Sequence, residues 1–139
     1  MALRMENILM NFMENELMLN TPYCQIQYLK EKNAILCTWK QFCKGEEYQE
    51  PFRYGLELIK KYNITTRITD TTNGFENEEA DTVWLLEEIL PQFIESSLEK
   101  IVFIIADDSP LMCEILGQKE ALGEFFEVEL VGKLYKEII

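Results

Sequence analysis

One segment of the chain places an acid and two hydroxyls in direct succession. It consists of Asp70, Thr71, Thr72, Asn73 and Gly74, and it follows an apolar run that predicts a strand. The Asn-Gly pair is typical of a turn. Two roles for the segment are open: a polar loop that contacts a partner, or an ST-turn in which the threonine hydroxyls satisfy nearby backbone groups.

A second chemistry to consider is metal binding by carboxylates. Asp70, Asp107 and Asp108 each follow a predicted parallel strand, at the edge where open α/β sheets bind ligands. Three carboxylates at that edge could hold Mg²⁺ together with water. Because such acids more often cap helices and turns, we predict neither a metal site nor a cofactor.

The absence of histidine limits catalysis. It excludes Ser-His-Asp and Cys-His pairs and every histidine metal site, and it leaves acid–base chemistry to carboxylates, Lys, Tyr or Cys. The cysteines, Cys24, Cys37, Cys43 and Cys113, include no Cys-x-x-Cys pair, so a zinc knuckle or thioredoxin motif is not expected. Reduced thiols are typical of a cytoplasmic protein. No catalytic constellation stands out, and we predict that the protein is not an enzyme.

Composition predicts one folded domain and excludes some partners. The 139 residues are 47% hydrophobic and 12% aromatic, which is enough to build a core. The net charge of -12 repels phosphate backbones and anionic membrane surfaces, so nucleic acid is not expected as a partner. No apolar run approaches the roughly 18 residues of a membrane span.

Hydrophobic periodicity predicts the elements that position these groups. Strands are predicted over residues 23–28, 34–42, 64–70, 101–106 and 127–131, and helices over 45–62, 77–96, 111–122 and 133–139. The short link between the first two strands implies an antiparallel hairpin, and the later strand–helix–strand order implies parallel pairing. The predicted fold class is α/β, a single domain with a mixed sheet of four or five strands and packed helices.

The ends of the predicted helices carry their own signals. Pro51 should kink the helix over 45–62 or delay its start, and Pro91 should bend or interrupt the helix over 77–96. Asn77 suits the N-cap of that second helix, and Ser109 suits the N-cap of the next.

The first 20 residues read as an N-terminal extension, followed by a domain over residues 21–139. The extension is rich in Met and Leu, but Glu6, Glu14 and Glu16 interrupt it, so it is not a signal peptide. We expect a short helix or an extension packed on the body of the domain.

The order of elements and several short motifs resemble the STAS domain, also called SpoIIAA-like or anti-sigma-factor antagonist-like. The nearest resemblance is to small bacterial proteins of the STAS/SEC14-like kind, and it covers roughly residues 23–139. The motifs are Thr38-Trp39-Lys40-Gln41-Phe42, Glu46-Glu47-Tyr48, the strand end at Asp70, Asp81-Thr82-Val83-Trp84 and Leu90-Pro91.

The resemblance implies a regulatory, non-enzymatic protein-interaction module. Anti-sigma-factor antagonists carry Asp-Ser-Ser-Gly after the third strand, and a kinase partner phosphorylates one serine there. The matching stretch here is Asp70 to Gly74, in which Thr71 and Thr72 replace the serines. We therefore expect a protein partner at this loop, with Thr71 and Thr72 at least partly exposed and a phosphorylation switch left open. A homodimer is a further open alternative.

The SEC14-like side of the resemblance implies a second function, the binding of an apolar small ligand or lipid. Trp39, Phe52 and Trp84 would then line a pocket, although aromatic residues at these spacings usually belong to the core. A deep apolar cavity would favour this ligand-binding function. A filled core with an exposed patch beside Asp70 would favour the interaction module.

Overall fold

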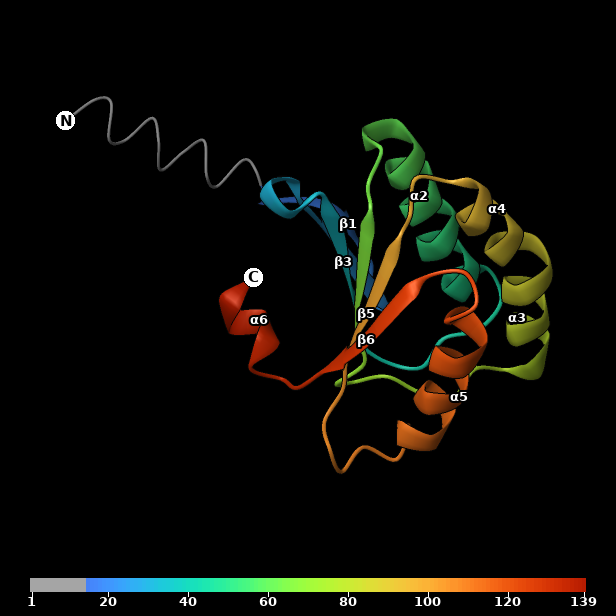
Figure 1. Ribbon diagram of the computed structural model, residues 1–139. Helices are drawn as coiled ribbons and strands as arrows, with labels where there is room; N and C mark the ends of the chain where they lie inside the picture. The colour runs from blue at the N-terminus through green and yellow to red at the C-terminus, as the bar shows by residue number, and fades with distance from the viewer. Residues whose placement is uncertain (1–14) are drawn as a thin grey trace.

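Six strands form one mixed sheet in the computed structural model, which describes residues 15–139 (Figure 1). The strands are β1 (Asn15–Asn20), β2 (Cys24–Leu29), β3 (Ala34–Trp39), β4 (Thr66–Asp70), β5 (Lys100–Ile104) and β6 (Glu127–Val131). They lie in the sheet in chain order. β1, β2 and β3 pair antiparallel, and β3 to β6 pair parallel. The predicted α/β mixed sheet is confirmed, with six strands rather than four or five.

The additional strand lies in the stretch that the sequence assigns to the N-terminal extension. β1 pairs with β2 from Asn15 opposite Leu29 to Asn20 opposite Gln25, with a register shift between Leu17 and Leu19. As an edge strand, it needs a pairing partner on one side only. The sheet therefore begins before residue 21. The rest of the predicted extension, residues 1–14, lies outside the described residues.

The helices divide unequally between the two faces of the sheet. They are α2 (Glu46–Tyr62), α3 (Glu79–Trp84), α4 (Leu90–Glu95), α5 (Met112–Leu122) and the short α6 (Tyr135–Ile138). Parallel strands in chain order, joined by crossovers of one hand, bring successive helices to one face. Accordingly, α2, α3, α4 and α5 cover the same face, and α6 lies on the other (Figure 1). None of the helices in residues 15–139 is both long and apolar enough to cross a membrane.

Pro91 does not break its helical segment. A π-helical turn, Leu85–Ile89, joins α3 to α4, so residues 79–95 form one continuous helical segment that is wider at this turn. Pro91 is the second residue of α4. A proline cannot donate the regular backbone hydrogen bond, and the wide turn before it accommodates that loss. Asn77 does not cap this helix, because the helix begins at Glu79 and the Asn77 side chain is engaged elsewhere.

Alternation along the strands sorts the core into two clusters. The cluster on the α2–α5 face is the larger one and includes Ile35, Cys37, Ile101 and Phe103. The opposite cluster consists of Leu29, Ala34, Leu36, Ile68, Val102 and Ile104, with Tyr135 and Ile139 packed against it. β4 breaks the apolar pattern, because Arg67 and Thr69 pair in register with Ile35 and Cys37 and so lie on the larger cluster's face. A cationic side chain thus enters the main core.

Candidate ligand-binding cavity

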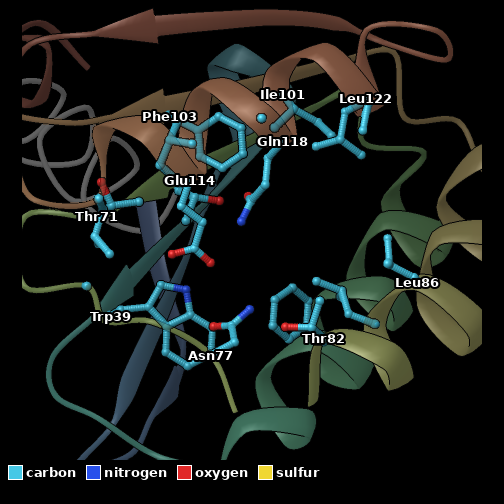
Figure 2. A pocket seen from close by; sticks show the side chains of 18 of the residues that line it. Trp39, Thr71, Asn77, Thr82, Leu86, Ile101, Phe103, Glu114, Gln118 and Leu122 are labelled. Carbon is cyan, nitrogen blue, oxygen red and sulfur yellow. The ribbon is translucent and has the colours of Figure 1, made fainter. Parts of the chain in front are cut away.

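A cavity of about 400 Å³ lies between the sheet and the helices of the α2–α5 face (Figure 2). Aromatic side chains make up much of its lining, namely Trp39, Tyr48, Phe52, Phe75, Phe93 and Phe103. Its volume falls within the roughly 300–1,000 Å³ of small-ligand pockets. The lining is predominantly apolar, with a few polar groups, which is the usual composition of such pockets.

The aromatic wall is built where β3 meets α2. Trp39, the last residue of β3, stacks on Tyr48 with ring centroids 5.4 Å apart and planes 17° apart. Phe52 lies one helical turn after Tyr48, and its ring centroid is 5.7 Å from that of Trp39. Phe75, in the loop after β4, meets Trp39 edge-on at 5.6 Å. These contacts fix the rings against one another, so the wall is formed without a ligand.

The predicted pocket residues are only partly brought together. Trp39 and Phe52 line the cavity, whereas Trp84 lies outside the lining and meets the Phe52 ring edge-on at 6.2 Å. Trp84 is half-buried, with the Arg53 guanidinium carbon 5.9 Å from its ring centroid. It therefore supports the wall from outside and is not the fully buried core residue that its spacing suggested.

Arg67 supplies a buried positive charge to the cavity. The residue is only 6% exposed, and its Nη1 donates a hydrogen bond to Thr69 Oγ1 at 2.5 Å. Its guanidinium carbon lies 4.9 Å from the Phe52 ring centroid and 5.8 Å from that of Phe93. Within the described part of the chain, Arg67 forms no ion pair with a carboxylate. Its neighbours thus include a neutral hydroxyl and two aromatic faces.

The titratable groups near Arg67 do not balance its charge. Burial raises the pKa of the Cys37 thiol, although the Arg67 guanidinium acts in the opposite direction. Burial likewise raises the pKa of the Tyr48 hydroxyl, which accepts a hydrogen bond from Asn77 Nδ2 at 2.9 Å. Both groups therefore stay neutral near pH 7, because each would have to lose its proton to become an anion.

Polar side chains face one another across the cavity. Figure 2 shows Glu114 and Gln118 of α5 on one side, with Asn77 and Thr82 on the other. Burial, and then the nearby charge of Glu76, raises the pKa of the Glu114 carboxyl. Leu86 also lines the cavity and is 52% exposed, so the cavity reaches the surface beside the π-helical turn.

The segment from Asp70 to Gly74 is split between the two faces of the sheet. Asp70 is buried on the α6 face, where its Oδ2 accepts a hydrogen bond from Lys136 Nζ at 2.8 Å. Its Oδ1 accepts from the backbone N–H and the hydroxyl of Thr72, at 3.0 and 2.6 Å. Burial opposes ionisation of Asp70, but the hydrogen bonds from Lys136 and Thr72 outweigh it and lower the pKa.

Thr71 points toward the cavity. Its hydroxyl donates to the backbone carbonyl of Ile104 at 2.7 Å, and it lines the cavity together with Gly74. The expectation that Thr71 is partly exposed was wrong, because this bond draws its side chain inward to 7% exposure. Thr72 and Asn73 are exposed, as expected for the tip of the loop. Both threonine hydroxyls thus bond within the protein, but not in the predicted ST-turn: Thr71 bonds to the neighbouring strand, and the local turn is made by the Asp70 carboxylate, which accepts from the Thr72 N–H.

The sequence reasoning missed several lining residues with polar side chains, among them Arg67, Glu114 and Gln118. Arg67 left one signal, which is a lone cation in the middle of a strand expected to be buried between two neighbours. Glu114 and Gln118 left none, since a Glu and a Gln four residues apart on a helix look like a solvated face. Among residues 15–139, no three acidic or cysteine side chains gather into a group that could hold a metal ion.

Comparisons with protein-family models, with curated proteins and with solved structures find no match to this chain. The STAS resemblance therefore stays a prediction, and the function has to be argued from the cavity itself.

Proposed function

We propose that this protein binds a small, predominantly apolar ligand in the cavity between the sheet and the α2–α5 layer. The observation that carries the proposal is the cavity of about 400 Å³ with its preformed aromatic wall. Protein interiors are close-packed, and voids larger than a water molecule are few in a domain. A space of this size, open to the surface beside Leu86, is best explained by an occupant.

The cavity suits binding rather than a reaction. Its lining offers ring faces and aliphatic groups to the body of a ligand, and each methylene buried there contributes about 0.8 kcal/mol. The polar groups Asn77, Thr82 and Gln118 can orient one end of the ligand or bind the water that enters with it. A preformed wall reduces the loss of side-chain entropy on binding, which favours affinity.

The interaction module expected from the STAS resemblance has less support. Asp70 is engaged with Lys136, and Thr71 is buried, so Thr72 and Asn73 are the residues of this loop that present an exposed surface. This second function predicts that Thr72→Glu weakens capture of a protein partner by more than Thr72→Val, which also loses the hydroxyl's hydrogen bond to Asp70 but adds no charge. The ligand-binding function predicts no effect of Thr72→Glu on ligand affinity.

Binding of N-phenyl-1-naphthylamine, a neutral apolar dye that fluoresces in apolar surroundings, tests the proposal. We expect saturable binding to the wild-type protein and quenching of Trp39 emission. Gly117 lines the cavity, and a Cβ added there meets nothing within 4 Å, so Gly117→Phe has room for its ring beside the cavity and should weaken the dye at least fivefold.

Leu116→Phe is the matched control, because Leu116 is an exposed neighbour on α5 that lies outside the lining. It should leave dye affinity unchanged. Absence of saturable binding to the wild-type protein, or equal binding to the two variants, would refute the cavity as a ligand site.

A further inference from the structure

Arg67 makes the cavity unlike a purely apolar pocket. A guanidinium carries five N–H donors, and the one side-chain hydrogen bond seen for Arg67 goes to the neutral hydroxyl of Thr69. The faces of Phe52 and Phe93 offset part of the cost of burying its charge. They do not replace an anion, because a buried charge needs an ionised partner to recover the solvation it loses.

That partner is not supplied by the described part of the protein. Among residues 15–139 no carboxylate forms an ion pair with Arg67, and this includes Glu114, the acidic residue of the lining. Cys24, Cys37 and Tyr48 are titratable groups that interact with the guanidinium, and burial raises the pKa of each, so they are neutral near pH 7. The charge of Arg67 is 94% buried, and Arg67 is one of the residues that line the cavity.

We propose that Arg67 binds the anionic head of the ligand, and that the ligand is an amphipathic monocarboxylate. This inference rests on the proposed function, since it names the ligand class of the same cavity. The planar fork of a guanidinium matches a carboxylate with two parallel hydrogen bonds. The head lies against β4, and the apolar body contacts the aromatic wall formed by Trp39 and Phe52.

A single negative charge fits the cavity better than two. Among the described residues 15–139, Arg67 is the one cationic residue of the lining, and Glu114 adds a carboxyl to the same space. A doubly charged phosphate monoester would leave one charge unpaired and place the other near that carboxyl. A carboxylate is neutralised by Arg67 alone.

Three ligands that share a ten-carbon chain but differ in the charge of the head group separate the contribution of charge to affinity from that of apolar contact. Decanoate, 1-decanol and decyltrimethylammonium are titrated at pH 7.5 against the dye-loaded wild-type protein. We expect decanoate to displace the dye at a concentration at least tenfold lower than decanol, with decyltrimethylammonium weakest, since charge-assisted hydrogen bonds are among the strongest that proteins form.

Substitutions test whether the guanidinium of Arg67 causes the preference for decanoate over decanol. Arg67→Met should bind decanoate and decanol about equally, and Arg67→Lys, which keeps the charge and loses the fork, should show an intermediate ratio. Arg53→Met is the control, because it removes an arginine of α2 that pairs with Glu46 outside the cavity. It should keep the full wild-type preference.

The outcomes distinguish the ligand class from the cavity function. Equal affinity of the wild-type protein for decanol and decanoate overturns the carboxylate assignment and leaves the apolar site standing. Decyl phosphate, titrated in the same way as a fourth ligand, overturns it in favour of a phosphate head if it binds more tightly than decanoate. No displacement by any of these compounds, together with no dye binding, refutes the proposed function itself. If Arg67→Met does not fold, the affinities of the wild-type protein and of Arg67→Lys for decanoate and decanol still decide whether Arg67 binds a carboxylate.

Discussion

Replacing Arg67 by methionine should not destabilise the ligand-free protein. The substitution removes a hydrogen bond from a charged donor to Thr69, worth about 1.5–3 kcal/mol, and two contacts with ring faces, each worth about 0.5–2 kcal/mol. Against these losses stands the desolvation of a 94% buried cation, which is several kcal/mol for a charge without an ionised partner. Methionine has a similar length and adds about 1.5–3 kcal/mol of apolar burial.

The opposing contributions leave a balance near zero or on the stabilising side. Replacing buried charges with apolar residues of similar volume is neutral or stabilising by about 1–4 kcal/mol in other proteins. For a chain of this length, 1 kcal/mol corresponds to a shift in Tm of roughly 3–5 °C. We therefore expect Arg67→Met to unfold at the wild-type Tm or up to several degrees above it.

The assay is urea unfolding and thermal unfolding of protein refolded from urea, so that bound ligand is removed. This step matters because a ligand that binds only the folded state raises its apparent stability. Adding decanoate should then make the wild-type protein more stable than Arg67→Met, since the wild type binds decanoate more tightly and so gains more stability from it. A loss above about 2 kcal/mol in ligand-free Arg67→Met would show that Arg67 is a satisfied structural residue, and the inference about its ligand would lose its basis.

Three further outcomes follow from the contacts. Lys136→Met should lower stability at pH 7 by about 1–2 kcal/mol, because it leaves the buried Asp70 carboxylate with Thr72 alone, whereas Lys133→Met should have little effect. The pKa of Asp70 is lowered in the folded protein, so the stabilisation from the ionised Asp70 is present above the ordinary carboxyl pKa and is lost as pH falls through the lowered value. Urea unfolding of the wild type and Lys136→Met at falling pH should therefore show the difference in stability between them shrinking. Trp84→Ala should cost about 1–3 kcal/mol in urea unfolding, less than a fully buried tryptophan, and should leave dye affinity nearly unchanged because Trp84 lies outside the lining. A chain that begins at Thr21 loses β1 and its pairing with β2, so its unfolding midpoint should lie below that of a chain beginning at Met13, and equal midpoints would contradict a structural role for β1.

The elements that the sequence predicted well are those with a clear period. The helix from Glu46 to Tyr62 and the hairpin of β2 and β3 follow directly from apolar spacing and turn residues. β1 was missed because Leu17, Met18 and Leu19 stand together between polar residues and show no alternation. Its place in the sheet depends on backbone pairing with β2, which side-chain patterns do not record.

The cavity lies beyond what residue types can specify. Trp39 and Phe52 looked like core residues, and both are buried, yet the volume beside them stays open. A cavity is set by how far apart α2, α5 and the sheet lie, which depends on many side chains at once. Sequence reasoning could therefore name part of the wall, but it could not decide between a filled core and a pocket.

Alternation along β4 explains why the predicted loop and the predicted pocket turn out to share residues. Successive side chains of a strand point to opposite faces, so Asp70 faces α6 while Arg67 and Thr69 face the α2–α5 layer. Thr71 continues that second set and lines the cavity, although the resemblance grouped it with Asp70 as a surface loop. A phosphate on Thr71 would have to displace its hydrogen bond to Ile104 and enter the core, whereas one on Thr72 would displace the hydrogen bond to Asp70 but would lie at the surface. The geometry therefore assigns Thr71 to the cavity and leaves Thr72 as the hydroxyl of this loop where a regulatory modification would be sterically accessible.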